Sequence, residues 1–355
     1  MPEGRDGRAG ALPVAAPLPS VAKVAALPPP GSIVNDVLIG HGGELFLARG
    51  AHAVLDYTSG RRQLPQRAFS RFAALIGQRA AVCERAGIGY RHLIFPDKQT
   101  VLREAYPMEN AVSLGALHME HCAEVAAQLL FPRDLLASAA ERTYQRTDTH
   151  ATHFGTMLVC AQVVAAFTGE DQAQRTREMR RRLTQRRMVT GDLGSKLAPP
   201  VSAEETGFEW NWPMHGFSND FAGGNNGIVD LFVAPAAPYE KRLLLFGDSF
   251  GRSMAKVLTY FFREVAFLRT PFLHREILQQ MKPDLVLTQG VERYLGSVKG
   301  DDAAPSFCMY PYMARTQLPY TPSREFADAY SAFLSYPRRP YRDFMQRIGL
   351  EHRLG

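Results

Sequence analysis

The sequence predicts an α/β protein with a parallel sheet and helices on both faces. Beyond residue 242, apolar runs at 243–246, 265–268 and 284–288 alternate with helix-like stretches at 253–262 and 273–281. This alternation is typical of crossover units, in which each helix returns the chain across one face of the sheet. Ligands of such sheets bind beyond the carboxyl ends of the strands, so we expect the functional residues there.

The N-terminal half supplies further elements of both kinds. Short apolar segments predict a hairpin with strands at 37–40 and 44–47, and another apolar run predicts a buried strand at 92–95. Apolar residues at helical spacing predict a helix over 66–86. Further helices are expected over 113–130, 134–142 and 152–167, and residues 170–225 are the least regular part of the chain.

The composition is that of a globular protein with a sizeable core. The 355 residues are 46% hydrophobic and 21% charged, and no window approaches the roughly 18 apolar residues that a membrane span needs. Residues 1–30 are rich in Ala, Pro and Gly, which predicts a disordered leader. One domain is expected over residues 31–335, followed by a short C-terminal tail over 336–355. Since the N-terminus lacks the apolar segment of a secretory signal, we expect a cytoplasmic protein.

Positive charge is concentrated in one stretch. Seven arginines lie between residues 175 and 187 in a chain with a formal net charge of +6. Such a run could form a cationic surface for an acidic glycan, a phosphate-bearing lipid or nucleic acid, or it could simply remain solvated. Because no aromatic residue lies in this stretch, base stacking is not indicated and we expect no nucleic-acid partner.

The string Gly247-Asp248-Ser249-Phe250 places a serine between the predicted strand at 243–246 and the helix that follows. At such a turn the hydroxyl is exposed and the backbone N–H lies at a helix N-terminus, where negative charge is stabilised. Ser249 is therefore a candidate nucleophile. The alternative is that Ser249 only caps the helix, a position that serine favours.

A second string, Asp148-Thr149-His150, places a carboxylate two residues before an imidazole. A neighbouring carboxylate can fix the tautomer of a histidine and stabilise the imidazolium that forms when a serine loses its proton. Ser249, His150 and Asp148 thus supply the nucleophile, the base and the orienting carboxylate of acyl transfer through an acyl-enzyme. This mechanism requires His150 within hydrogen-bond reach of Ser249.

The same histidine lies among residues that could bind a metal. Asp148, His150 and His153 are close in sequence, and His118 and His121 share one face of a predicted helix. Zinc accepts such ligands, but the HExxH motif is absent and the helix histidines can equally pack in the core. We therefore expect no metal site and no cofactor.

Two arginines are candidates for substrate binding. Arg269 and Arg293 each follow a predicted strand. Their guanidinium groups could hold an anionic or carbonyl-bearing substrate by forked hydrogen bonds, or each could form a structural ion pair, for instance with Glu292. Trp210 and Trp212, with asparagines nearby, have the composition of a sugar-facing loop.

Four strings make the chain similar to the SGNH hydrolase-like O-acetyltransferases of the alginate O-acetylation type. Their order and spacing cover most of residues 40–295, and the Asp-Thr-His string followed by Gly-Asp-Ser is the most specific part. The strings are Gly42-Gly43-Glu44-Leu45-Phe46-Leu47; Phe95-Pro96-Asp97-Lys98 ahead of Tyr106-Pro107; Tyr144-Gln145-Arg146-Thr147-Asp148-Thr149-His150 with Gly155; and Phe246-Gly247-Asp248-Ser249-Phe250 with Glu292-Arg293.

The resemblance implies a flavodoxin-like SGNH sheet and a triad in the order Asp148, His150, Ser249. That order is circularly permuted relative to SGNH esterases, whose serine comes first. The resemblance also implies that the catalytic domain transfers acetyl groups to hydroxyls of a bacterial polysaccharide or related glycan, with the donor supplied by a membrane acyltransferase. Ala151 stands where the family usually has a tryptophan. Family members commonly work in the periplasm, which is the alternative to the cytoplasm.

An O-acetyltransferase acting on a glycan hydroxyl is therefore the leading hypothesis. The sequence does not separate it from a carbohydrate acetyl esterase, because the same triad can deliver the acyl group to water. A catalytically inactive glycan-binding module is a third hypothesis, from a different functional class. The acetyl donor, the acceptor sugar and the second oxyanion-hole donor do not follow from the residues.

Overall fold

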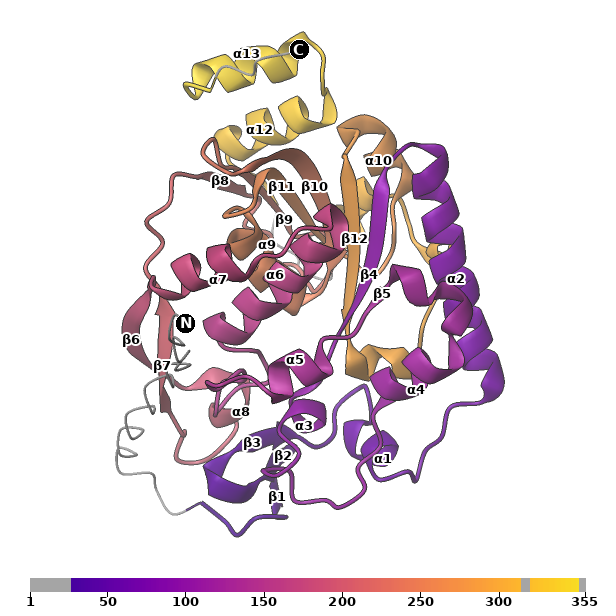
Figure 1. Ribbon diagram of the computed structural model, residues 1–355, viewed down its shortest axis with the longest axis vertical. Helices are drawn as coiled ribbons and strands as arrows, with labels where there is room; N and C mark the ends of the chain where they lie inside the picture. Colours follow the sequence, from indigo (N-terminus) through magenta and orange to yellow (C-terminus); the bar gives the residue numbers. More distant parts are fainter. Residues whose placement is uncertain (1–26, 314–319, 351–355) are drawn as a thin grey trace, which may run out of the picture.

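The computed structural model describes residues 27–313 and 320–350, and its centre is a seven-stranded sheet with helices on both faces (Figure 1). The strands from the first edge to β11 are parallel, whereas β11 pairs antiparallel with its next neighbour, and that strand antiparallel with the last. The predicted α/β architecture is thus confirmed, with a mixed sheet rather than an all-parallel one. In spatial order the strands are β5 (Leu129–Leu130), β4 (Gly89–Phe95), β12 (Leu285–Val291), β10 (Tyr239–Gly247), β11 (Phe262–Arg269), β9 (Val229–Val233) and β8 (His215–Ser218).

The central strand β10 shows why its sequence is a continuous apolar run. Leu243 and Leu245 pack into one hydrophobic core, whereas Leu244 and Phe246 pack into the other. Since successive side chains of a strand point to opposite faces, a strand covered on both faces needs apolar residues at every position. The first core is shared with α6 (His153–Thr168) and α9 (Ser249–Leu258), and the second with α2 (Gln66–Arg85), α10 (Arg275–Met281) and α12 (Arg324–Leu334).

Several expected elements are present with shifted ends. The hairpin is formed by β2 (Val37–Ile39) and β3 (Leu45–Leu47), which β1 (Ile33–Val34) extends to a three-stranded sheet. The helix expected over 113–130 breaks at Cys122. Its two parts are α4 (Leu114–His121) and the 3-10 helix η2 (Ala123–Gln128), and the helix expected over 134–142 is the shorter α5 (Arg133–Ala137).

The region expected to be least regular contains defined elements. The arginine-rich stretch forms α7 (Ala173–Arg180) and β6 (Leu183–Val189), and β6 pairs antiparallel with β7 (Ala203–Phe208). A short helix, α8 (Gly191–Gly194), connects these two strands. The remaining elements are η1 (His41–Gly43), α1 (Val54–Thr58), α3 (Lys98–Val101), η3 (Glu292–Gly296), η4 (Asp301–Ala303), η5 (Phe307–Met309) and α11 (Tyr310–Met313).

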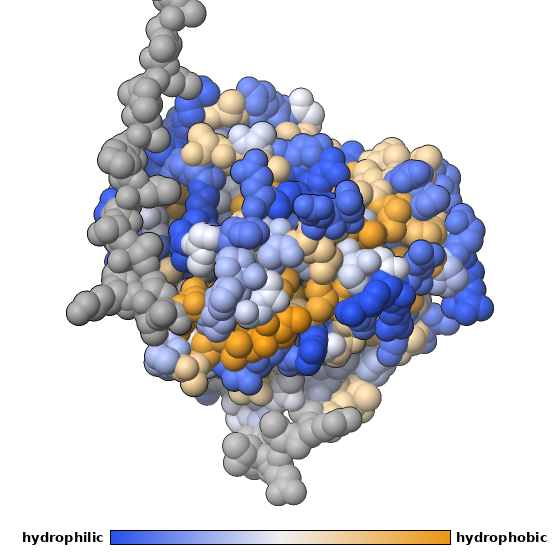
Figure 2. Space-filling model, turned by 90° about the horizontal axis from the view of Figure 1, so that it is seen from below, coloured by the Kyte–Doolittle hydropathy of each residue, from blue (hydrophilic) through white to orange (hydrophobic). Residues whose placement is uncertain are grey.

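One end of the sheet carries the small elements that surround the predicted site. The strands β1, β2 and β3 lie with α3 and α8 beyond the carboxyl ends of β4 and β12, in the lower part of Figure 1. Figure 2 views the molecule from below and shows that hydrophilic side chains surround a hydrophobic strip on this face. This end of the sheet is where an α/β protein binds its ligands.

The opposite end is covered by the C-terminal helices (Figure 1). Residues expected to form a tail include α13 (Arg339–Arg347), which packs on α12 and buries Tyr341, Phe344 and Met345. Residues 1–26 of the expected leader lie outside the described residues. None of the helices in the described part of the chain has the length and apolar character that crossing a bilayer demands.

Candidate active site

Ser249 lies on the turn between β10 and α9, as the sequence predicts. Gly247 ends the strand and Ser249 is the first residue of the helix. The alternative role of Ser249 as the helix cap is wrong, because Asp248 is the cap. Its Oδ1 accepts a hydrogen bond from Phe250 N–H, and its Oδ2 accepts one from Val291 N–H, each at 2.8 Å. A cap at this position also lets α9 begin earlier than the expected residue 253.

Gln289 of β12 supports this turn from the neighbouring strand. Its Oε1 accepts hydrogen bonds from the N–H groups of Asp248 at 3.1 Å and Gly251 at 3.0 Å. A Cβ at Gly247 would lie 2.6 Å from the same oxygen, and one at Gly251 would lie 2.7 Å from it, so a side chain at either position would displace the amide of Gln289. Sequence reasoning missed Gln289. The one feature that could have indicated it is a polar residue following the apolar run of its strand.

His150 lies within hydrogen-bond distance of Ser249, although 99 positions separate them in the chain. The Nε2–Oγ distance is 2.7 Å. On the other side of the ring, Nδ1 lies 2.6 Å from Asp148 Oδ1, which also accepts His150 N–H at 2.8 Å. The ring of Phe250 stacks on the imidazole with 4.5 Å between centroids. The structure therefore brings together the three residues that the sequence named as nucleophile, base and orienting carboxylate.

The hydrogen bonds of Asp148 determine its charge. Burial alone would raise the pKa of Asp148, but the hydrogen bonds and charge of His150 outweigh burial and hold that pKa below its usual value. The ionised carboxylate is an acceptor, so Nδ1 of His150 carries a proton. In the neutral ring Nε2 is then the acceptor, and it faces the hydroxyl of Ser249.

A buried lysine of α3 holds the turn that contains Asp148 and His150. Lys98 Nζ donates hydrogen bonds to the carbonyl oxygens of Leu45 at 2.8 Å, Gln145 at 2.6 Å and Arg146 at 2.9 Å. It also pairs with Glu44 at 3.1 Å. Burial lowers the pKa of Lys98 to about 8, although the negative charge of Glu44 opposes that effect. Three of the four strings that resemble the acetyltransferase family therefore meet around the ammonium group of Lys98.

Arg293 lies next to this arrangement and is already paired. Its guanidinium forms an ion pair with the buried carboxylate of Asp97 and lies 5.5 Å from the centre of the Phe250 ring. Only 10% of its side chain is exposed. The structural ion pair that the sequence left open is thus present, with Asp97 rather than Glu292. Substrate binding by Arg293 stays a prediction.

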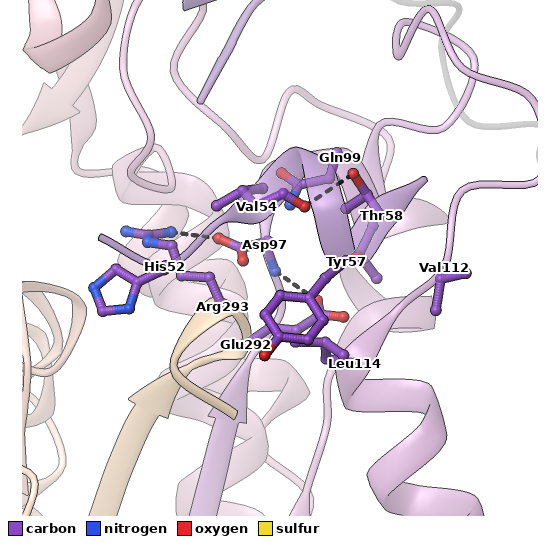
Figure 3. A pocket seen from close by; sticks show the side chains of 11 residues that line it. His52, Val54, Tyr57, Thr58, Asp97, Gln99, Val112, Leu114, Glu292 and Arg293 are labelled. Carbon is purple, nitrogen blue, oxygen red and sulfur yellow. Dashed lines mark hydrogen bonds and ion pairs between the residues drawn. The ribbon is translucent and has the colours of Figure 1, made fainter. Parts of the chain in front are cut away.

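Asp97 and Arg293 line a small cavity together with Glu292 and His52 (Figure 3). Burial raises the pKa of both Asp97 and Glu292. Glu292 accepts hydrogen bonds from Ser113 Oγ at 2.5 Å and from Asp97 N–H at 2.9 Å. The cavity of about 10 Å³ has room for about one water molecule. The cavity itself is therefore too small for a sugar or an acyl donor.

Arg269 ends β11 and pairs in register with Gly247, at the carboxyl edge of the sheet. Its Nη2 donates a hydrogen bond to Asn225 Oδ1 at 3.2 Å, and within the described residues no carboxylate pairs with it. Trp212, in contrast, is buried and donates from Nε1 to Thr259 Oγ1 at 2.8 Å. The sugar-facing interpretation is therefore wrong for Trp212, while the role of Arg269 stays a prediction.

The histidines considered as metal ligands have other partners. His153 Nδ1 accepts a hydrogen bond from Phe208 N–H at 2.8 Å, and His118 Nδ1 bonds to Leu114 O at 2.7 Å. Across the described ranges, one group of three potential ligands lies within 4.8 Å of one another, and it consists of Asp148, His150 and Asp192. Asp192 is a further residue that sequence reasoning missed, since its region offers no motif or periodicity.

A family model described as the SGNH hydrolase-like domain of acetyltransferase AlgX matches residues 45–305, which include both the Asp-Thr-His turn and Ser249. No curated protein matches the chain by sequence.

Several solved structures match the chain at low sequence identity. Bacillus cereus PatB1 with a sulfonyl adduct has a TM-score of 0.51 at 10% identity, covering 66% of this chain and 92% of that one. The O-acetyltransferase domain of Pseudomonas putida AlgJ has a TM-score of 0.49 at 14% identity, covering 78% and 99%. Pseudomonas aeruginosa AlgX has a TM-score of 0.43 at 13% identity, covering 74% and 63%. At such identities the likeness to PatB1 concerns the fold alone.

Proposed function

The chain belongs to the SGNH hydrolase-like acetyltransferase family of AlgX, and we propose that it transfers acetyl groups to a hydroxyl of a bacterial polysaccharide or related glycan. The transfer would proceed through a covalent acyl-enzyme on Ser249. The observation that carries this proposal is the continuous hydrogen bonding from Asp148 through His150 to Ser249. A serine whose hydroxyl faces an oriented imidazole is an activated nucleophile for acyl carbon.

In the first half-reaction, Ser249 Oγ bonds to the acyl carbon of the donor while its proton passes to His150 Nε2. The oxyanion that forms needs hydrogen-bond donors. The N–H groups of Asp248 and Gly251 donate to Gln289 Oε1, and that of Phe250 donates to Asp248 Oδ1. The N–H of Ser249 is thus left to bond the oxyanion. One such donor typically stabilises the transition state by roughly 3–4 kcal/mol. The bond between the acyl carbon and the donor's leaving group then breaks as His150 gives its proton to that group, and the acyl group stays on Ser249. Asp148 remains ionised throughout.

In the second half-reaction, a hydroxyl of the glycan attacks the same carbon. Its proton passes to His150 Nε2, the bond to Ser249 Oγ breaks, and the serine recovers the proton from the imidazole. The enzyme is thereby returned unchanged and the glycan carries the acetyl ester. Transfer prevails over hydrolysis when the bound glycan excludes water from the acyl-enzyme.

Substitution of the two central residues tests this function. We expect Ser249→Ala and His150→Ala each to remove nearly all acetyl transfer, and the double variant to lose no more than either single one, because the residues act as a unit. Ser253→Ala, one turn further along α9, is the matched serine control. The measurement is acetyl ester on an added glycan alongside free acetate.

Full additivity of the two losses would contradict a shared mechanism. If added glycan never diverts acetyl groups from free acetate, the chain is an esterase instead. If Ser249→Ala leaves turnover unchanged, the acyl-enzyme proposal fails altogether.

A further inference from the structure

The short helix α8 approaches the Asp-Thr-His turn from a distant part of the chain. The carbonyl oxygen of Thr147 accepts hydrogen bonds from Leu193 N–H at 3.2 Å and Gly194 N–H at 2.9 Å. The hydroxyl of Thr147 donates to the carbonyl oxygen of Val189 at 3.0 Å. Thr147, the residue just before Asp148, is therefore bonded to both ends of the segment 189–194.

Glycine at residue 191 permits this close approach. Gly191 has φ of +66°, and a Cβ there would lie 2.2 Å from Thr147 O and 2.8 Å from Asp148 Cβ. A side chain at this position would thus push α8 away from the turn and would also strain its own backbone. The contact between the two segments is a built feature of the fold.

Asp192 makes the contacts that reach the triad. Its Oδ1 accepts a hydrogen bond from Thr149 N–H at 2.8 Å, and its Oδ2 accepts one from Thr149 Oγ1 at 2.5 Å. Its backbone N–H donates to Asp148 Oδ2 at 2.9 Å. His150 occupies Asp148 Oδ1. Asp192 therefore holds the remaining oxygen of that carboxylate, together with the N–H and the hydroxyl of Thr149.

We propose that Asp192 is a positioning residue of the active site, which keeps Asp148 and His150 aligned on Ser249 by holding Thr149. It touches no reacting atom. The inference rests on the proposed function, since the alignment matters only if these residues act together. A rotation of the Thr149 peptide would move the carboxylate and the imidazole relative to each other. A displacement of about 1 Å in such a site can cost about 100-fold in rate.

Two substitutions of Asp192 remove its hydrogen bonds to Thr149 to different extents. Asp192→Ala removes both acceptors of Thr149, whereas Asp192→Asn retains one. With p-nitrophenyl acetate as the acyl donor, we expect Asp192→Ala to lower kcat by about 10- to 100-fold with KM within about two-fold of wild type. Asp192→Asn should lie between the two. Glu204→Gln removes an exposed carboxylate on the adjoining β7 and is the matched control, with unchanged kcat.

A second variant distinguishes positioning from mere stability. Thr149→Val removes the hydroxyl that Asp192 accepts, so Asp192→Ala combined with Thr149→Val should cost less than the product of the two single losses. The rate at which a sulfonyl fluoride modifies Ser249 should fall in parallel with kcat, while the thermal midpoint of Asp192→Asn stays near that of wild type. A kcat that falls only with the folded fraction would indicate a structural role and overturn the inference.

The outcomes separate this inference from the proposed function. If Ser249→Ala and His150→Ala abolish turnover and Asp192→Ala retains wild-type kcat, the positioning role is wrong and the triad stands. If Ser249→Ala retains turnover, the proposed function itself is wrong.

Discussion

Three N–H groups surround the carboxylate of Asp148. Two come from the backbone and ring of His150 and one from the backbone of Asp192. Donors of this kind stabilise the charged form, which is why the pKa of Asp148 lies below its usual value in spite of burial. The carboxylate therefore stays ionised as the imidazole gains a proton, which is the state that acyl transfer requires of it.

Lys98 offers a prediction about pH. Its pKa is lowered to about 8 by burial, whereas a lysine in an unfolded chain titrates near about 10.4. Between these values the unfolded chain binds more protons than the folded one, so the contribution of Lys98 to stability rises with pH. Relative to Lys98→Met, the unfolding free energy of wild type should gain on the order of 2 kcal/mol from about pH 8 to about pH 10.

Denaturant titrations of both proteins at matched pH give this difference directly. Comparison with the methionine variant cancels the titration of other groups. A difference that stays flat or falls across the same range would show that the ammonium of Lys98 is not held in the environment described above.

Among individual residues, the catalytic candidates could be predicted from the sequence more readily than the residues that hold them in position. Asp148, His150 and Ser249 are predictable because they lie in short motifs whose residue types indicate a carboxylate, a base and a nucleophile. Gln289 and Asp192 are not, since their contacts depend on how distant segments approach one another. Lys98 ends the string Phe95-Pro96-Asp97-Lys98, but nothing in the sequence indicates that several carbonyl groups surround its side chain.

At the scale of elements, the turn between β10 and α9 is set by its neighbours. The helix packs so closely on β12 and β11 that a Cβ at Gly251 would lie 2.7 Å from Gln289 Oε1 and 3.3 Å from a ring carbon of Phe267. Both hydrogen bonds from the turn to Gln289 depend on this closeness. The position of Ser249 thus follows from packing within the sheet as well as from its own string.

Gly251→Ala should therefore displace the first turn of α9. We expect kcat to fall at least ten-fold, because the serine moves relative to His150, and we expect a loss of about 1–3 kcal/mol in stability from overpacking. Gly290→Ala is the matched control, since a Cβ at Gly290 has no atom within 4 Å. Equal kcat values for the two alanine variants would contradict this account of the turn.

Element boundaries show what periodicity alone could not predict. The apolar spacing of α9 becomes regular only after its first turn, so the start was expected at 253 while the cap at Asp248 sets it at Ser249. The break at Cys122 has no counterpart in the apolar pattern, which continues through it. The elements between residues 170 and 225 were not predicted, because polar and charged residues together make up most of α7 and β6.

At the scale of the whole molecule, the predicted site and the C-terminal helices occupy opposite ends of the sheet (Figure 1). At the distal end, the guanidinium of Arg242 lies 3.9 Å from the centre of the Tyr336 ring and pairs with Glu264 at 2.5 Å. The helix α13 adds the buried ring of Phe344 to the same core. A substitution among the C-terminal helices should consequently lower the stability of the protein without changing the activity of the folded molecules.

Phe344→Ala tests that separation. The ring is 4% exposed, and truncation of such a side chain should lower the unfolding free energy by about 3–5 kcal/mol. Turnover per folded molecule should remain at the wild-type value, because no residue of the triad contacts α13. Tyr312→Ala, at a residue that is 83% exposed, should change neither quantity. A specific loss of kcat in Phe344→Ala would show that the two ends are coupled.

The alternation of strands and helices was enough to predict the sheet and its general architecture. The antiparallel β8 and β9 were not predicted, since β8 contains only four residues and lies in the polar region before the regular pattern begins. Apolar periodicity describes strands that are buried on both faces, and an edge strand lacks that pattern.

The identity of the residue that carries the acetyl group is the most direct test of the whole account. The protein is mixed with excess acetyl donor in the absence of glycan, quenched rapidly with acid, and mapped by peptide mass spectrometry. We expect an acetyl group on Ser249 in wild type, none at that position in Ser249→Ala and far less in His150→Ala. Rapid turnover of the donor with Ser249 unmodified, or with the acetyl group on another residue, would contradict it.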